Sequence, residues 1–200
     1  MAAAAAALGY QPQNSSSPSP PVETSSPAPP SSFLAAPPSK APRSERRGVP
    51  GKADGVVPDG VTVFDDGYPA VADLDPDLLK TLRRAATDAA DDGVTFYVNS
   101  GWRSPEYQKR LLRDAISKYG SEDEAARWVA TPTTSSHVSG DAVDIGHSDA
   151  AAWLSEHGAG YGLCQIYRNE PWHYELRATA MDRGCPRMYA DPTQDPRMKQ

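Results

Sequence analysis

Histidine and cysteine, which bind transition metals in many proteins, are scarce here: the 200-residue chain has four of the first and two of the second. The cysteines, Cys164 and Cys185, lack the CxxC spacing of many metal sites, so we expect neither to be a metal ligand. Long apolar runs are missing as well, and no segment is long enough to span a membrane. No cysteine near the N-terminus is placed to carry a lipid.

Basic side chains are outnumbered by acidic ones. The chain has 20 Lys and Arg against 26 Asp and Glu, which gives a formal net charge of -6. Several of the basic residues fall together in residues 40–47, so the remainder is more acidic still. Nucleic-acid binding requires clustered Lys and Arg to neutralise phosphates. The sequence therefore argues against a nucleic acid as partner.

Residues 1–56 lack the aliphatic periodicity of a folded segment. They are rich in Pro, Ser and Ala and hold about half of the 20 prolines. Such a segment buries too little apolar surface to offset the entropy of ordering it, so we predict a disordered, semi-extended tail. The alanine tract at its start is only mildly apolar, and no basic residue precedes it. It is either a weak or truncated export signal or a low-complexity tail.

From residue 57 onwards the chain alternates between helical periodicity and short β-branched or aromatic runs, which predicts one folded domain over residues 57–200. We expect helices over 76–92, from 105 past 116, over 121–128 and over 150–156, and strands over 94–98, 142–145, 161–167 and 172–177. The last two strands should form an antiparallel pair. Helices come mostly first and strands mostly later, which indicates an α+β fold with a small antiparallel sheet flanked by helices.

Two short segments contain side chains suited to metal-assisted hydrolysis. The first carries His137 and Asp144, and the second carries Glu170 and His173. Two imidazoles and one carboxylate can bind zinc and leave a fourth position open, while a second carboxylate accepts a proton. Each residue also has an ordinary interpretation on its own: a turn histidine, a capping carboxylate or a solvated loop glutamate.

Strand alternation favours the joint interpretation. Within residues 142–145, Val143 and Ile145 can face a core while Asp144 faces a cleft. His173 can likewise point into the cleft while its neighbours pack elsewhere. Glu175, two residues further on the same strand face, either orients His173 or lies at the surface.

The spacing also resembles that of a known family. The matching segments are Ser135-x-His137-x-x-Gly140-x-Ala142-x-Asp144, Glu170-Pro171-Trp172-His173 and the upstream Ser100-Gly101-Trp102-Arg103-Ser104-x-x-x-Gln108. Over residues 57–190 the chain is similar to the VanY-type D-alanyl-D-alanine metallocarboxypeptidases. Their wider fold group includes the lysostaphin-type peptidases and the hedgehog signalling domain, and the resemblance implies the same fold.

The resemblance implies a role for each matched residue. It makes His137, Asp144 and His173 the ligands of one Zn²⁺ per chain and Glu170 the general base. Arg103 would stabilise the oxyanion of the transition state.

Gln108, Ser135 and Trp102 are the expected substrate-binding residues. Ser135 would bond the substrate carboxylate, with a local turn hydrogen bond as the alternative. Trp102 and Trp172 would wall the pocket, although large aromatic side chains more often belong to a core.

The implied activity is hydrolysis of the terminal D-Ala-D-Ala bond of peptidoglycan stem peptides, outside the cell or in association with a bacterial cell wall. A cell-wall endopeptidase, a D-Ala-D-Ala dipeptidase and a non-catalytic wall-binding module containing zinc are the alternatives. The sequence leaves the oligomeric state open, and a monomer is the default expectation. In an exported protein Cys164 and Cys185 would form a disulfide that closes a loop of about 20 residues and stabilises the fold by about 3 kcal/mol. Two buried free thiols are the alternative.

Overall fold

The computed structural model describes residues 48–199; most of the predicted disordered tail, residues 1–47, lies outside them. The helices are α1 (Pro69–Ala72), α2 (Pro76–Asp91), α3 (Pro105–Tyr119), α4 (Glu122–Ala126), α5 (Ser136–Ser139), α6 (Ser148–His157) and α7 (Ala180–Arg183). The strands are β1 (Tyr97–Ser100), β2 (Ala142–Gly146), β3 (Leu163–Gln165) and β4 (His173–Leu176). Short 3-10 helices cover η1 (Lys52–Asp54), η2 (Gly158–Tyr161), η3 (Pro192–Gln194) and η4 (Pro196–Lys199).

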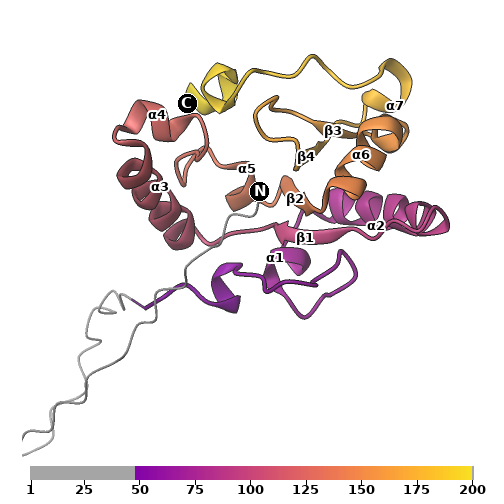
Figure 1. Ribbon diagram of the computed structural model, residues 1–200, viewed down its shortest axis with the longest axis horizontal. Coiled ribbons are helices and arrows are strands. Elements are labelled where there is room, and N and C mark those ends of the chain that lie inside the picture. The colour runs from indigo at the N-terminus through magenta and orange to yellow at the C-terminus, as the bar shows by residue number, and fades with distance from the viewer. Residues whose placement is uncertain (1–47, 200) are drawn as a thin grey trace, which may run out of the picture. The chain divides into compact units, whose positions relative to one another are not determined.

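The four strands form one sheet in the order β1-β2-β4-β3, and each neighbouring pair is antiparallel (Figure 1). This confirms the α+β fold with a small antiparallel sheet and helices around it, including the expected pairing of the last two strands. In the centre of the sheet, Asp144 of β2 lies opposite His173 of β4 on one side and Ser100 of β1 on the other. The chemistry-bearing residues of distant segments therefore meet in the sheet itself.

The two faces of the sheet differ in character. Val143, Ile145 and Tyr174 join the main hydrophobic cluster together with residues of α2 and α6. Asp144 and His173 alternate with them along the same two strands, so their side chains point to the opposite face. One face therefore carries the core and the other the polar groups.

Caps and end signals fix the longer helices where the sequence predicts them. The Asp75 side chain accepts hydrogen bonds from the backbone N–H of Asp77 and Leu78 at the start of α2, and Pro76 occupies the first helical position. Ser104 caps α3 in the same way. Along α3, Gln108 and Ala115 are the buried residues, and Leu111 and Leu112 are half-buried.

Two boundaries differ from the sequence prediction. The strand expected over 94–98 begins only at Tyr97, because the N–H of Val94 donates to Ala89 at the end of α2 and the carbonyl of Phe96 accepts from Val63 instead of a sheet neighbour. The tail also gives way to folded structure before residue 57. The carbonyl of Asp54 in η1 accepts the N–H of Ser104, which anchors this stretch to the start of α3.

Cys164 of β3 forms a disulfide with Cys185, 21 residues further along the chain. The bond ties the segment that follows α7 to the edge of the sheet. Among residues 48–199, no helix combines the length and apolar character that crossing a bilayer requires.

Gly101 offers a test of how closely the backbone packs behind the sheet. A Cβ there would overlap the carbonyl of Ala70 in α1, which accepts the N–H of Trp102. We expect Gly101→Ala to lower the free energy of unfolding by about 1–3 kcal/mol, since α1 or the turn must shift. Urea unfolding measures this. Gly160→Ala is the matched control because a Cβ there meets nothing within 4 Å; equal losses in both variants would contradict the packing argument.

Candidate metal centre

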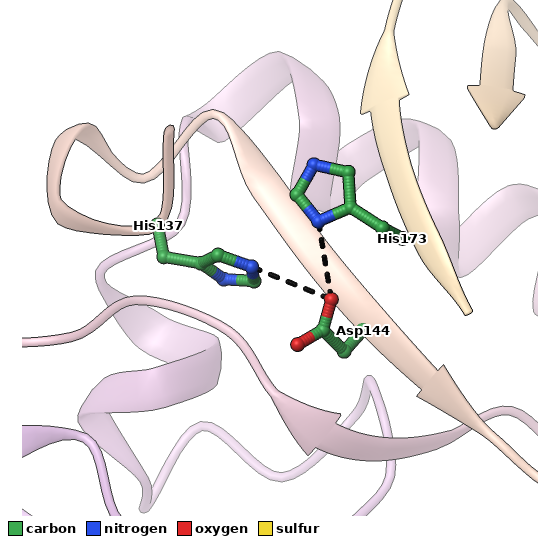
Figure 2. A group of neighbouring side chains, drawn as sticks. All are labelled: His137, Asp144 and His173. Carbon is green, nitrogen blue, oxygen red and sulfur yellow. Dashed lines mark hydrogen bonds and ion pairs between the residues drawn. The ribbon is translucent and has the colours of Figure 1, made fainter. Parts of the chain in front are cut away.

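Asp144, His137 and His173 form a buried trio on the polar face of the sheet (Figure 2). Asp144 Oδ1 lies 3.3 Å from His137 Nε2 and 3.2 Å from His173 Nδ1. The two imidazole rings are 5.0 Å apart between centroids and stand at 69° to each other. One nitrogen of each ring and one carboxylate oxygen therefore converge on a common point.

His137 owes its place to a one-turn helix between Ser135 and Gly140. Gly140 adopts a left-handed conformation, with φ of 84°, which lets the chain turn directly from α5 towards β2. His137 Nδ1 lies 2.8 Å from the carbonyl oxygen of Gly101. Because a carbonyl only accepts, Nδ1 carries the proton and donates it, so the lone pair of Nε2 faces Asp144.

His173 is placed by the register of β4, which sets it opposite Asp144. Its Nε2 lies 3.3 Å from Glu175 Oε1 on the other side of the ring. Burial alone would lower the pKa of His173, but hydrogen bonds to Asp144 and Glu175 outweigh it and raise the pKa to about 9. A cation bound at Nδ1 takes the place of one proton, while Nε2–H continues to donate to Glu175.

The trio fits a zinc ion in geometry and in donor type. Donor atoms at about 2.0–2.2 Å from a tetrahedral zinc lie about 3.3 Å apart, close to the two spacings that Asp144 makes here. Burial holds the pKa of His137 below its usual value, with the charge of Arg103 adding to the effect, so this ring is neutral. Burial would raise the pKa of Asp144, but contacts with His137, His173 and Arg103 keep it well below its usual value. A neutral imidazole and an ionised carboxylate are the forms that bind a metal.

Arg103 connects this trio to the start of α3. Its Nε donates to Ser100 Oγ at 2.7 Å, one terminal nitrogen donates to Gln108 Oε1 at 3.1 Å, and the other donates to Asp144 Oδ2 at 3.0 Å. Three of the five guanidinium N–H groups can make these contacts. The remaining two are available to a ligand in the pocket that Arg103 lines.

Glu170 lies in the turn that leads into β4, with a carboxylate oxygen 3.8 Å from His173 Nδ1. Only 7% of the residue is exposed. Burial is the main reason that the pKa of Glu170 is raised to about 7. A cation bound to the trio would act against burial and lower this pKa towards the usual range of a glutamate.

A pocket of about 210 Å³ opens over the trio, and Arg103, Gln108, Ser135 and Glu170 all line it. Four of the residues that the sequence assigns to catalysis or substrate binding thus share one cavity with the expected ligands. Gln108 is nearly inaccessible, because its amide accepts from Arg103 and donates to the carbonyl of Ala130 at 2.9 Å. It holds Arg103 in place, in addition to lining the pocket.

Trp102 is not brought to this pocket, contrary to the sequence prediction. It is half-buried and absent from the pocket lining, while Trp172 lines the pocket and is 40% exposed. The N–H of Trp102 donates to the carbonyl of Ala70 in α1, while its neighbour Arg103 contacts the trio. Of the two tryptophans considered as pocket walls, the structure thus places one.

Several pocket residues were missed by the sequence analysis. Tyr167 packs its ring against His173, with centroids 5.1 Å apart, and Trp128 lines the pocket near the end of α4. Ser136 lies beside Ser135, and Met198 reaches the pocket from η4. Ser136 lies inside the first motif and could have been considered; neither Trp128 nor Met198 belongs to any motif, and their sequence positions give no signal of proximity.

Comparison with known proteins places this geometry in a family context. The sequence model of the VanY family, described as D-alanyl-D-alanine carboxypeptidase, matches residues 72–179. A curated D-alanyl-D-alanine carboxypeptidase of Enterococcus faecalis is 34% identical over 111 residues, a match that covers 43% of this chain and 41% of that protein. The chain thus spans about two fifths of the length of this relative.

Solved structures share the fold. The structure of VanYB in complex with D-alanine-D-alanine aligns with a TM-score of 0.51 at 27% identity, over 56% of this chain and 74% of that one. The LdcB LD-carboxypeptidase aligns with a TM-score of 0.51 at 24% identity, over 64% of this chain and 71% of that one. The similarity to LdcB shows a shared fold.

The trio predicts a stabilising response to zinc. A ligand held only by the folded chain at about 100 times its Kd stabilises by about 2.7 kcal/mol, which corresponds to a rise in Tm of roughly 5–10 °C for a domain of this size. Calorimetry with and without zinc measures the shift. We expect Asp144→Asn to abolish it. Asp141→Asn, which changes an exposed carboxylate of the same motif, should retain it; a zinc response that survives Asp144→Asn would exclude this centre.

Proposed function

Because the chain belongs to the VanY family of D-alanyl-D-alanine carboxypeptidases, we propose that it is a zinc-dependent carboxypeptidase that hydrolyses the terminal D-Ala-D-Ala bond of peptidoglycan stem peptides. The solved relative VanYB is described in complex with D-alanine-D-alanine, the dipeptide at the end of such a substrate. The pocket over the trio is the place where this end of the peptide binds.

His137, Asp144 and His173 hold one zinc ion. When bound, the ion acts as a Lewis acid that polarises the scissile carbonyl and makes water more acidic. Gly101 and Glu175 accept the outward-facing N–H of the two imidazoles, which fixes both rings with a lone pair directed inwards. The site is therefore preorganised by contacts within the chain.

Glu170 is the general base. Its carboxylate lines the pocket beside His173, within reach of a water molecule that attacks the peptide carbonyl. It accepts the proton of that water and then passes it to the amine of the leaving D-alanine. A buried carboxylate whose pKa is raised towards neutrality can perform both transfers.

Arg103 and Ser135 bind the substrate. The two N–H groups of Arg103 that have no partner among residues 48–199 can stabilise the negative charge that develops on the carbonyl oxygen. Ser135 lines the same pocket, and its hydroxyl can donate to the terminal carboxylate of the peptide. Gln108 keeps the guanidinium of Arg103 oriented towards both tasks.

The burial of Glu170 beside the trio is the observation that carries the catalytic proposal. A structural zinc site in a wall-binding module has no use for a second, unligated carboxylate in a pocket. Removing such a group from water has a free-energy cost that its function must justify. The same observation supports hydrolysis over binding alone.

We further propose that the catalytic unit comprises the whole of residues 48–199, that it acts as a monomer, and that it works outside the cell at the bacterial wall. Peptidoglycan stem peptides are found there, and no nucleic acid or membrane partner is required for the reaction. The stem peptide is the partner that the pocket accommodates.

The decisive assay is release of D-alanine from a tripeptide ending in Lys-D-Ala-D-Ala, with and without a chelator. We expect release to stop on chelation and to return with zinc. Glu170→Gln should lower kcat/KM by about 10²–10⁴-fold while zinc content stays at the wild-type level, because the proton acceptor is lost and the ligands remain.

Glu156→Gln is the matched control, since Glu156 is an exposed carboxylate on α6 remote from the pocket lining. It should retain wild-type activity. Wild-type turnover by Glu170→Gln would remove Glu170 from the mechanism. A zinc-loaded protein that cleaves intact wall and leaves the tripeptide untouched would favour an endopeptidase, and release from free D-Ala-D-Ala alone would favour a dipeptidase.

A further inference from the structure

The segment that follows the disulfide, residues 186–199, is here called the C-terminal strap. It lies beyond residues 72–179, the part that the family model matches. Tyr189 bridges in parallel to Tyr167, with its N–H donating to Ile166 at 3.0 Å and its carbonyl accepting from Arg168 at 2.9 Å. Figure 1 shows the strap in yellow, running from α7 towards α4.

The strap is anchored at two points. Cys185, immediately before it, is bonded to Cys164 of β3. Further along, Asp191 accepts a hydrogen bond from Arg127 at the end of α4, at 3.2 Å. Pro192 and Met198, which follow Asp191 along the strap, line the pocket. The strap therefore has a fixed path across the polar face of the sheet.

Arg197 of the strap forms a bidentate ion pair with Glu175, the carboxylate that contacts His173. Its two terminal nitrogens donate to the two oxygens of Glu175, at 2.7 Å and 3.1 Å. Glu175 is fully buried, so this fork neutralises a charge that water cannot reach. The oxygen that Arg197 contacts at 3.1 Å is the one that lies 3.3 Å from His173 Nε2.

Asp195 reaches His173 by a second route. It is 1% exposed, accepts the Nε–H of Arg197 at 2.9 Å and accepts the hydroxyl of Tyr167 at 3.0 Å. The ring of Tyr167 then packs against the face of His173. These contacts form a closed circuit that runs through His173, Glu175, Arg197, Asp195 and Tyr167 and back to His173. Glu175 contacts the edge of the imidazole ring, and Tyr167 packs against its face.

Arg177 also contacts Glu175 but has no hydrogen bond to Asp195 among the described residues. Without Arg197, Arg177 could still supply a positive charge. The link between Glu175 and Asp195 would be lost, however, together with the bidentate hydrogen bond to the Glu175 carboxylate. The orientation of His173 thus depends on the shape of the contact as well as on its charge.

We infer that Arg197 and Asp195 are positioning residues of the metal centre: the strap orients His173 for metal binding through Glu175 and Tyr167. The inference rests on the proposed function only in requiring that the trio binds a metal. It assigns to the strap a role in the metal affinity of the site, over and above its place in the pocket wall.

The test compares Arg197→Ala, Arg197→Lys and Arg187→Ala in the full chain. Zinc affinity is measured by competition with a chromophoric chelator, and ligand geometry by the visible spectrum of the Co²⁺-loaded protein. We expect Arg197→Ala to weaken zinc binding about 10–100-fold and to alter the Co²⁺ bands. Arg197→Lys should recover little, since a lysine cannot make the fork. Arg187 is an exposed arginine of the same strap, so its variant should match the wild type.

Tyr167→Phe serves if Arg197→Ala does not fold. It removes only the hydroxyl that reaches Asp195, and we expect a several-fold loss of zinc affinity with a shifted Co²⁺ spectrum. Wild-type affinity and spectrum in a folded Arg197→Ala, or in Tyr167→Phe if that is the variant available, would overturn the inference. A wild type that binds zinc but releases no D-alanine would overturn the proposed activity and leave the role of the strap standing.

Discussion

The polar half of the structure depends on one buried carboxylate. Asp144 sits in the middle of the sheet, away from water, and a lone charge there would be strongly destabilising. The guanidinium of Arg103 and the imidazole of His173 pair with this charge, and the neutral ring of His137 completes its surroundings. Each of these partners is in turn held by another group: His137 by the carbonyl of Gly101, His173 by Glu175, and Arg103 by Ser100 and Gln108. The loops and helices around the sheet are arranged so that this charge is matched.

The organisation of charge continues outwards in a second layer. Glu175 is a buried anion beside His173, and it is matched by Arg177 and Arg197. Burial would raise the pKa of Glu175, but its hydrogen bonds with His173 and Arg197 lower it instead. Glu170 differs, since burial dominates there and its pKa rises. Of these three neighbouring carboxylates, Asp144 and Glu175 have lowered pKa values and Glu170 has a raised one. Charged partners therefore stabilise the ionised form of the first two, and burial favours the protonated form of the third.

Local patterns predicted much of this. Alternation along 142–145 placed Asp144 opposite the core residues Val143 and Ile145, and helical periodicity predicted α2 and α3 close to their observed bounds. What depended on tertiary contacts could not be read in the same way. Residues 94–96 stay outside the strand because the N–H of Val94 donates to Ala89 at the end of α2, and Trp102 is absent from the pocket lining while the neighbouring Arg103 is part of it. The strap carries no motif, and its arginine is adjacent to Glu175 only after the chain has folded back over the sheet. Glu175 itself was left with two interpretations, and burial decides between them.

The register of β2 against β4 decides whether a folded molecule can bind a metal ion. In an antiparallel sheet a slip by one residue turns every side chain to the other face. Such a slip of β4 would direct His173 into the apolar core and bring Tyr174 to the polar side, so the three donor atoms could no longer converge. Misregistered molecules would retain a sheet and most of their helices yet lack the trio. Uptake of a metal ion therefore discriminates between correctly and incorrectly paired strands, and it selects the native register by mass action.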